Sequence, residues 1–316
     1  MHVLVSDPIH AEGIERLEAE GYEVEQAYEL SDDALLDHLA DVDALIVRSA
    51  TNVTEAQLDV ASRLRVIARA GIGVDNIDIE AATARGIQVV NAPMGGVHAV
   101  AEHTLALAFA LVRDLPATDR DTRAGKWPKP GYTGTELSDK TLGIIGFGRI
   151  GSEVARRASA LGVEVIAFDP YIEDVEREGN EVELVSFEAC LDRADIVTIH
   201  TPLTEDTRGK FDREVLHQLG GSYLINCARG GIVDEHALAE LLEMGHIEGA
   251  AIDVFEDEPL GEDHPLCQLD NVILTPHIAG SSDRAQRTIA RSVATQVMAA
   301  LRDEPIDHPV NHPSST

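Results

Sequence analysis

A glycine turn between two apolar segments constrains the fold of this chain more than any other feature. Residues 141–151 read Thr-Leu-Gly-Ile-Ile-Gly-Phe-Gly-Arg-Ile-Gly, so an apolar run leads into the pattern G-x-G-x-x-G. Residues 152–158 have helical character, and a second apolar run over 163–168 ends at Asp169. This succession of strand, glycine turn, helix, strand and acid is typical of a dinucleotide-binding α/β unit.

Each glycine of the pattern has its own expected role. Gly146 permits the tight turn, Gly148 lets the backbone approach a pyrophosphate, and Gly151 lets helix and strand pack closely. The helix N-terminus adds free N–H groups and a partial positive charge for the phosphates. The alternative interpretation is a glycine-rich turn that binds no ligand.

The acid after the second strand predicts which dinucleotide binds. A carboxylate at Asp169 accepts hydrogen bonds from the adenosine ribose hydroxyls and repels a 2′-phosphate. Pro170 and Tyr171 follow, with no adjacent Arg or Lys to receive such a phosphate. The sequence therefore predicts NAD rather than NADP.

Length and charge exclude several classes of protein. The 316 residues suffice for two domains, and the longest apolar run, 105–112, is far shorter than the roughly 20 residues of a membrane span. With 25 basic and 56 acidic residues, the net charge of −31 argues against nucleic-acid binding. The acids are spread along the chain, which we interpret as adaptation to high salt; an ordinary acidic soluble protein is the alternative.

The cysteines and the N-terminus indicate a cytoplasmic protein. Cys190, Cys227 and Cys267 are too few and too scattered for a disulfide framework or a zinc site, so we expect no metal. Residues 1–5 lead directly into an expected strand and lack the pattern of a signal peptide. A reducing cytoplasm fits both observations.

The first 90 residues alternate short apolar runs with amphipathic segments. We expect strands at 3–5, 22–24, 44–47, 66–68 and 87–90. Helices are expected at 11–19, at 32–39 with Ser31 as N-cap, and after Thr54 as N-cap. Strict alternation predicts a parallel sheet with helices on both faces. Because this half lacks a phosphate-binding glycine pattern, we expect it to bind the substrate.

The remaining chain predicts a second unit of the same class. One helix is expected from Gly96 to about residue 115; its nearly all-round apolar surface predicts burial, either in a subunit contact or between domains. Strands are expected at 194–200, 223–226, 249–255 and 272–275, and two acidic loop stretches after Asp169. A last helix over about 282–301 should cross back to the first half.

The predicted fold class is α/β with two doubly wound parallel-sheet domains. A flavodoxin-like substrate domain would comprise residues 1–95 and 283–316. A Rossmann NAD-binding domain would comprise 96–282, joined to the first by long hinge helices.

Polar residues follow the strands of the second unit. Thr201, Arg229, Asp253 and His277 should face one crevice, because ligands of open parallel sheets bind at the carboxyl ends of the strands. Arg229 can bind a carboxylate through two hydrogen bonds, and His277 can accept a proton near neutral pH. Glu258 is a candidate partner that orients His277. Each residue alone is more often structural or solvated; jointly they suit oxidation of a 2-hydroxy acid.

The chain resembles the D-isomer-specific 2-hydroxyacid dehydrogenase family over nearly its whole length. Matching segments lie at 47–51, 69–78, 101–104, 143–151, 200–203, 226–234, 251–255 and 276–277. The resemblance implies Arg229, Glu258 and His277 as catalytic residues, and a homodimer built on the helix after Gly96.

The resemblance also implies binding residues. Those for NAD are Gly146, Gly148, Arg149, Ile150, Gly151, Asp169, Thr201, Pro202, Cys227, Ala228, Arg229, Asp253, His277 and Gly280. Those for the small-molecule substrate are Arg48, Ser49, Arg69, Ile72 and Gly73.

Within the family, the implied reaction is NAD-dependent oxidation of D-3-phosphoglycerate to 3-phosphohydroxypyruvate, the entry step to serine. Arg48 and Arg69 suit a dianionic phosphate, although ion pairs with surface acids are the other interpretation. Residues 94–98 and Ile72 lack polar groups usual in phosphoglycerate enzymes. Reduction of glyoxylate, hydroxypyruvate or another 2-keto acid therefore stays an alternative, and a non-catalytic NAD-sensing regulator is a third. The resemblance further implies that the regulatory C-terminal domain of longer relatives, with its feedback by serine, is missing.

Overall fold

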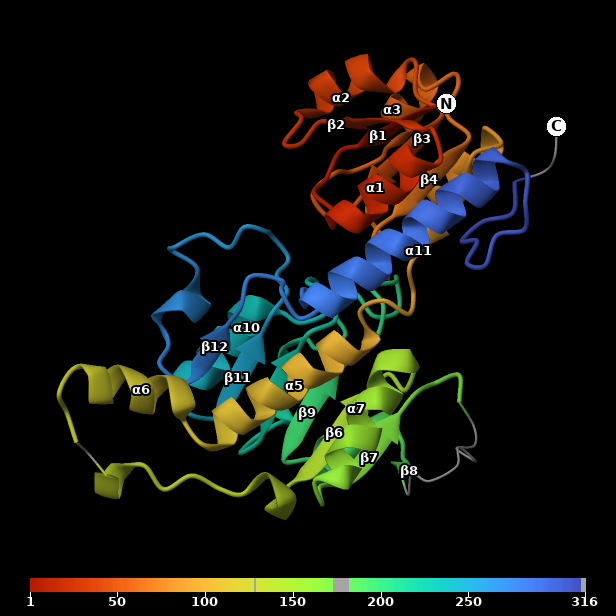
Figure 1. Cartoon of the computed structure of the whole chain (residues 1–316). Coiled ribbons are helices and arrows are strands. Elements are labelled where there is room, and N and C mark those ends of the chain that lie inside the picture. The colour runs from red at the N-terminus through yellow and green to blue at the C-terminus, as the bar shows by residue number, and fades with distance from the viewer. Residues whose placement is uncertain (128, 173–181, 314–316) are drawn as a thin grey trace. The chain divides into compact units, whose positions relative to one another are not determined.

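The computed structural model describes residues 1–127, 129–172 and 182–313, and the chain divides into two compact units (Figure 1). Unit 1 comprises Met1–Gly96 and Gly280–Thr316, and unit 2 comprises Val97–Ala279. The chain passes from unit 1 to unit 2 directly before the long helix α5 (Val97–Val112). It returns to unit 1 shortly before the long helix α11 (Asp283–Leu301).

Unit 1 is built on a five-stranded parallel sheet. Its strands are β1 (His2–Val5), β2 (Glu23–Gln26), β3 (Ala44–Val47), β4 (Val66–Arg69) and β5 (Gln88–Asn91). The strand order is β2-β1-β3-β4-β5, and all pairs are parallel, which is the flavodoxin-like order. Every residue of β3 is buried, as expected for a strand covered on both faces. The predicted fold class of this unit is confirmed.

Helices cover both faces of this sheet. They are α1 (Ala11–Ala19), α2 (Asp32–Leu39), α3 (Glu55–Val60), α4 (Ile79–Ala84) and α11. Leu17 of α1 and Val293 of α11 share one hydrophobic core with the sheet, whereas Leu35 of α2 and Leu58 of α3 share the other. The Ser31 hydroxyl accepts a hydrogen bond from the Ala34 N–H at 3.3 Å, so the predicted cap is confirmed.

Unit 2 is built on a seven-stranded parallel sheet. Its strands are β6 (Thr141–Ile145), β7 (Glu164–Phe168), β8 (Glu183–Leu184), β9 (Ile196–Ile199), β10 (Tyr223–Asn226), β11 (Gly249–Ile252) and β12 (Val272–Leu274). The order is β12-β11-β10-β9-β6-β7-β8. The chain runs outward from β6 through β7 and β8, then returns to β9 on the other side of β6. This reversal is the switch point at which ligands of such sheets bind.

The helices of unit 2 are α5, α6 (Leu115–Arg123), α7 (Arg149–Ala160), α8 (Phe187–Arg193), α9 (Arg213–His217) and α10 (Glu235–Glu243). Short 3-10 helices η1 (Lys129–Gly131), η2 (Leu137–Asp139) and η3 (Pro265–Gln268) complete the unit. The predicted single helix to about residue 115 was too long. It ends at Val112, and Asp114 adopts a left-handed φ of 50° before α6 begins. Of the region predicted as acidic loops, 173–181 lies outside the described residues, while 183–184 and 187–193 form β8 and α8.

The predicted burial of α5, either in a subunit contact or between domains, is incomplete within this single chain. Nine of its residues are buried, but His98, Glu102, Ala106 and Phe109 form an exposed stripe at helical spacing. Ala106 and Phe109 hide the second half of this stripe in the sequence, because both residues are apolar although they are exposed here. Within the described chain, no helix has both the length and the apolar character of a membrane span.

Candidate active site

The glycine turn lies between β6 and α7, at the switch point of the unit 2 sheet. Gly146 has a φ of 95°, and a side chain there would meet the backbone of His200 at 2.8 Å. A side chain at Gly151 would overlap the carbonyl oxygen of Gly146, so helix and turn pack without space for one. Nothing lies within 4 Å of a Cβ built on Gly148. At Gly146 and Gly151 the protein itself leaves no room for a side chain, whereas Gly148 faces open space. A turn that binds a pyrophosphate requires this combination.

Asp169 stands directly beside this turn. Its Oδ2 accepts a hydrogen bond from the Phe147 N–H at 2.8 Å, and its Oδ1 accepts one from the Tyr171 N–H at 2.9 Å. The backbone bond from the Gly146 N–H to the Phe168 oxygen, 2.8 Å long, holds the end of β7 against the turn. The acid and the glycine turn, whose last glycine lies 18 residues earlier in the sequence, therefore share one edge of the sheet.

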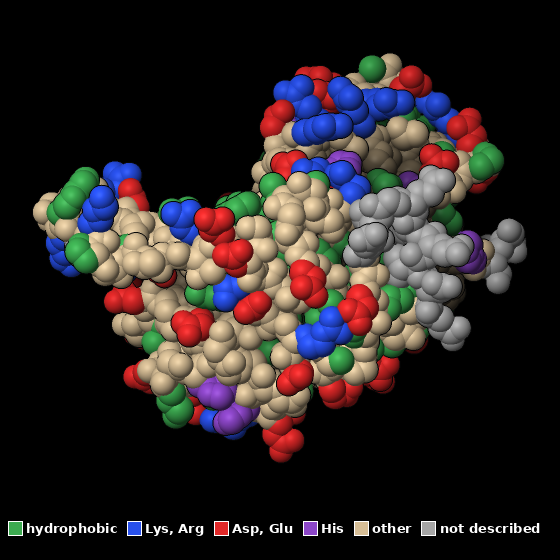
Figure 2. All heavy atoms as spheres, turned by 90° about the horizontal axis from the view of Figure 1, so that it is seen from below, with side chains coloured by type: hydrophobic (Ala, Val, Ile, Leu, Met, Phe, Trp, Pro, Cys, Tyr) green, Lys and Arg blue, Asp and Glu red, His purple; other side chains and the backbone are tan. Residues whose placement is uncertain are grey.

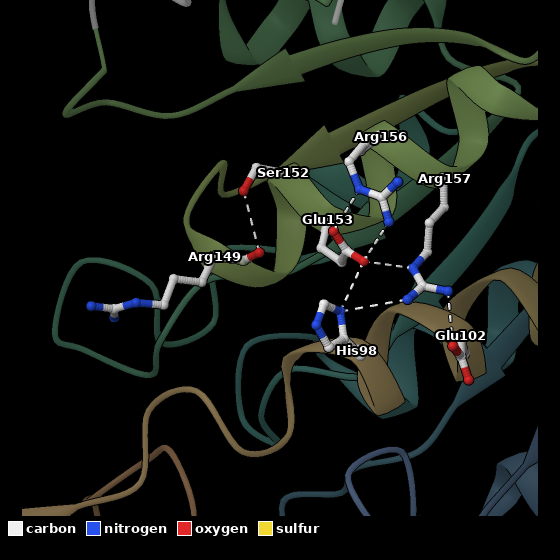
Figure 3. Close-up of polar contacts among 7 residues, drawn as sticks. All are labelled: His98, Glu102, Arg149, Ser152, Glu153, Arg156 and Arg157. Carbon is white, nitrogen blue, oxygen red and sulfur yellow. Dashed lines mark hydrogen bonds and ion pairs between the residues drawn. The ribbon is translucent and has the colours of Figure 1, made fainter. Parts of the chain in front are cut away.

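A charged cluster holds α7, the helix that follows the turn, against α5 (Figure 3). The Glu153 carboxylate accepts hydrogen bonds from Arg156 at 2.8 Å and from Arg157 at 2.7 Å, and His98 lies 2.9 Å away. The Arg156 hydrogen bond, followed by those of Arg157 and His98, lowers the pKa of Glu153 far below its usual range although burial opposes this. Arg149 extends away from the cluster (Figure 3), exposed at the first position of α7. Its charge is thus placed where a phosphate would meet the helix N-terminus.

The loop after β10 carries Arg229 in a fixed turn. The buried Asn226 side chain accepts a hydrogen bond from the Ala228 N–H and donates one to the Arg229 carbonyl oxygen, both 3.0 Å long. The Arg229 guanidinium donates to the Ala228 oxygen at 2.7 Å. Burial raises the pKa of the Cys227 thiol to about 12, so this residue stays protonated and is no nucleophile.

Thr201 and Pro202 follow β9, the central neighbour of β6. His200 precedes them, with its Nε2 3.0 Å from the Thr198 hydroxyl, and burial lowers its pKa to about 3. The imidazole is therefore neutral, and this strand end contributes no charge to the site.

Glu258 and His277 form a hydrogen-bonded pair. The Glu258 Oε2 lies 2.7 Å from His277 Nδ1, and the Glu258 Oε1 accepts a bond from the Phe255 N–H at 3.0 Å. Burial raises the pKa of Glu258, but the bonds from His277 and Phe255 and the charges of His277 and Arg229 outweigh it and lower that pKa. The carboxylate thus stays ionised at neutral pH. It fixes the ring so that Nε2 is the nitrogen left for a substrate.

Asp253, at the end of β11, holds the turn that carries His277. Its side chain is fully buried; Oδ1 accepts bonds from the Thr275 hydroxyl at 2.5 Å and the Ile278 N–H at 2.9 Å, and Oδ2 accepts one from the Ala279 N–H at 2.9 Å. His277 has a φ of 54°, a conformation that costs free energy in a residue other than glycine. The Asp253 carboxylate stabilises this conformation from both sides of the turn.

Unit 1 carries the predicted substrate residues at two adjacent strand ends. Arg48 directly follows Val47, the register partner of Arg69 in the β3–β4 pair. The buried Asp7 carboxylate accepts bonds from the Arg48 N–H at 2.5 Å and the Thr51 N–H at 3.2 Å, which shapes the loop after β3. The Arg48 guanidinium donates to the Pro8 oxygen at 3.2 Å.

The other residues of that predicted set lie in the same two loops. Ser49 is exposed next to Arg48. A side chain at Gly71 would overlap the Arg69 guanidinium, which therefore rests on the backbone of that loop. Ile72 and Gly73 follow, half-buried, and the Ile72 oxygen accepts a bond from the Asn91 amide at 2.6 Å.

Several residues that shape these loops were missed by sequence reasoning. Asp7, Asn226 and Glu153 each hold a loop or helix of the site through buried or half-buried hydrogen bonds. A polar residue at the last position of an apolar strand, as at Asn226, is a usable signal. Glu153 gives none, because a glutamate with an arginine three or four residues later on a helix is commonplace.

Comparisons with known proteins identify the family. The family described as "D-isomer specific 2-hydroxyacid dehydrogenase, NAD binding domain" matches residues 105–279. The chain is 42% identical over 315 residues to D-3-phosphoglycerate dehydrogenase of Archaeoglobus fulgidus, covering 99% of this chain and 60% of that protein. It is 47% identical over 305 residues to the enzyme of the same name from Methanocaldococcus jannaschii, covering 96% and 58%. The chain thus spans less than two thirds of these relatives.

A solved structure agrees with this assignment. The NAD-dependent formate dehydrogenase from Staphylococcus aureus in complex with NAD is 30% identical, with a TM-score of 0.89 over 99% of this chain and all of that one. The glycine turn, the acid beside it and the parallel sheet are thus those of an NAD-binding domain. The chain belongs to the D-isomer specific 2-hydroxyacid dehydrogenase family.

Proposed function

We propose that this protein oxidises a D-2-hydroxy acid with NAD. His277 accepts the hydroxyl proton through Nε2, Arg229 binds the carboxylate, and Glu258 stabilises the imidazolium that forms. The chemistry that NAD⁺ supplies when bound is acceptance of the hydride from C2 of the substrate. The observation that carries the proposal is the Glu258–His277 pair, whose atoms lie 2.7 Å apart. The positive charge of Arg229 also acts on the Glu258 carboxylate, so all three side chains belong to one site.

The side chains present fit NAD. The turn leaves open space at Gly148, directly before the N-terminus of α7, and Asp169 stands beside it as the acceptor for ribose hydroxyls. We assign unit 2 as the NAD-binding domain and unit 1 as the substrate domain. The residues that would hold the cofactor are Gly146, Gly148, Arg149, Ile150, Gly151, Asp169, Thr201, Pro202, Cys227, Ala228, Arg229, Asp253, His277 and Gly280.

The proposed substrate is D-3-phosphoglycerate, oxidised to 3-phosphohydroxypyruvate. Two relatives that cover nearly the whole chain carry that activity in their names. Arg48 and Arg69, at the ends of neighbouring strands, supply two guanidinium groups for a phosphate dianion. Ser49, Ile72 and Gly73 would complete the substrate loops. A cytoplasmic location suits a biosynthetic enzyme whose three cysteines are all free.

A panel of substrates tests this function. The purified protein in high salt would be assayed with NAD and D-3-phosphoglycerate, and with NADH and glyoxylate or hydroxypyruvate. We expect the highest kcat/KM with phosphoglycerate, and a loss of about 100-fold in Arg48→Ala for this substrate against little change for glyoxylate. A preference of the wild type for glyoxylate would assign the reductase function instead. NADH binding without any turnover would indicate a sensor.

We also propose a homodimer built on α5 and α6. Phe109 is 39% exposed in the α5 stripe, Leu115 is exposed on α6, and Trp127 beyond α6 is 80% exposed. Side chains of α6 are all at least partly exposed, so unit 2 alone gives this helix no core. Sedimentation of the wild type and of the double variant Phe109→Asp, Leu115→Asp would test the proposal. We expect a dimeric wild type and a monomeric variant, and a monomeric wild type would overturn the proposal.

A further inference from the structure

A second histidine–carboxylate pair lies beneath the loop that carries Glu258. Glu235 is the first residue of α10 and only 9% exposed, which is rare for a carboxylate unless it is paired. Its Oε2 lies 3.1 Å from Nε2 of His264. Its Oε1 accepts a hydrogen bond from the Glu256 N–H at 2.7 Å.

The protonation of His264 is fixed by its other contact. The Nδ1 atom accepts a bond from the Leu266 N–H at 3.4 Å, so it carries no proton. Burial, followed by the charge of His236, lowers the pKa of His264, so the neutral ring has its one proton on Nε2. The Nε2 atom of His264 therefore faces the Glu235 carboxylate as a close polar contact of 3.1 Å.

One buried carboxylate thus binds the Glu256 N–H at one end of the segment 256–264 and contacts His264 at the other end. Glu258 lies inside this segment, two residues from the Glu256 N–H that Glu235 binds. The segment has little packing of its own, since residues 256–259 and 261–263 are exposed. Leu260 packs against the hydrophobic core of unit 2. A cavity of about 400 Å³, lined by Arg208, Asp257 and Gly261 among others, lies beside the segment. The Glu256 hydrogen bond and the His264 contact, more than packing, therefore set its position.

The hydrogen bond from Glu256 to Glu235 also affects the position of Arg229. A side chain at Gly230 would overlap the carbonyl oxygen of Phe255 and crowd the Glu256 nitrogen. The backbone after Arg229 therefore rests directly on the residue that Glu235 holds. A shift of Glu256 would move both the guanidinium and the Glu258 carboxylate relative to His277.

We propose that Glu235 and His264 are positioning residues that hold the Glu258 loop in its catalytic geometry. They touch neither substrate nor cofactor and act through Glu256. The inference rests on the proposed dehydrogenase function. A loop displaced by about 1 Å is expected to slow turnover strongly and to change NADH binding far less, because the glycine turn is not part of the loop.

Kinetics of matched variants test this inference. Glu235→Ala should lower kcat about 10- to 100-fold, with the Kd for NADH within twofold of the wild-type value. Glu235→Gln keeps an oxygen for the Glu256 N–H and should recover part of the loss. His264→Gln keeps a donor near Nε2 and should exceed His264→Ala in kcat. Glu243→Ala, which removes an exposed carboxylate from the same helix, is the control and should behave as wild type.

A second measurement separates this inference from the proposed function. Hydrogen–deuterium exchange needs no turnover, and Glu235→Ala should speed exchange in peptides covering 255–264 but not in those covering 146–160. If the wild type oxidises no 2-hydroxy acid, the proposed function fails while exchange still decides the role of Glu235. Exchange and kcat of Glu235→Ala equal to those of Glu243→Ala would overturn the inference. Should Glu235→Ala not fold, Glu235→Gln and His264→Gln decide it in the same way.

Discussion

The histidine of the proposed catalytic trio occupies an unusual backbone conformation. His277 has a φ of 54°, held by the Asp253 carboxylate, and its Nδ1 is occupied by Glu258. Nothing about His277 in the sequence predicts this geometry, because it follows from a buried acid 24 residues earlier. The sequence did predict that the residue ends a strand of the nucleotide sheet and pairs with Glu258.

Removing the imidazole tests its role as proton acceptor. His277→Ala should lower kcat about 100- to 10,000-fold, since general base catalysis contributes that much. The Kd for NADH, measured by fluorescence titration, should change far less than kcat, because His277 is one of many proposed cofactor contacts. Glu258→Gln should lower kcat less, because the base remains but loses its ionised partner. A His277→Ala enzyme with more than a tenth of wild-type kcat would contradict the mechanism.

Two glycines of the turn should respond oppositely to one added methyl group. Gly151→Ala would drive a Cβ into the Gly146 oxygen and should lower the melting temperature by several degrees. Gly148→Ala has open space and should keep the melting temperature, but weaken NADH binding about tenfold or more because the methyl occupies the cradle. Thermal melts and NADH titrations of both variants check the contrast; equal NADH affinity of Gly148→Ala and wild type would remove the turn from cofactor binding.

At the level of elements, α5 and α7 are joined by charge as well as by packing. The Glu153 carboxylate takes hydrogen bonds from two arginines of its own helix and contacts His98 of α5 (Figure 3). Glu102 of α5 in turn accepts a bond from Arg157 at 2.8 Å. The cluster thus fixes the helix whose N-terminus carries the glycine turn.

The cluster makes the stability of this contact depend on pH. Because the pKa of Glu153 is lowered in the folded protein, its ionised form contributes stability above the unfolded value of 4.5 and loses it as pH falls below that value. Glu153→Gln should lower the free energy of unfolding by about 2 kcal/mol at pH 7, and by less at pH 4. Urea unfolding at both pH values checks this. The more exposed control Glu102→Gln should cost below about 0.5 kcal/mol.

At the scale of the whole molecule, the acidic excess is a surface property. Acidic side chains are scattered over the face seen in Figure 2. With 56 acidic and 25 basic residues, this surface repels itself at low ionic strength, which supports the proposed adaptation to salt.

Salt should therefore stabilise the protein. Raising KCl from 0.05 M to 1 M shortens the Debye length several-fold and should raise the melting temperature by about 5 °C or more. Sucrose at equal osmolality, which does not screen charge, is the control and should give a smaller increase. A melting temperature that is already maximal in dilute buffer would mark the chain as an ordinary acidic protein.

The sequence by itself determined the α/β class, the parallel strands, the Ser31 helix cap and the glycine turn with its acid. These follow from local patterns: burial makes strands apolar, and capping and turns demand particular side chains within a few residues. It also predicted the pairing of Glu258 with His277, since strand ends of one sheet meet at one edge.

Only the tertiary structure decided what holds those residues in place. The turn of His277 depends on Asp253, the loop of Glu258 on Glu235 and His264, and the orientation of α7 on Glu153. The sequence likewise did not predict the break between α5 and α6 or the exposed stripe of α5. The physical reason is that an acid's role depends on which donors surround it. In a chain with so many acidic residues, only the three-dimensional packing distinguishes a buried carboxylate that holds a loop in place from an acidic side chain exposed to solvent.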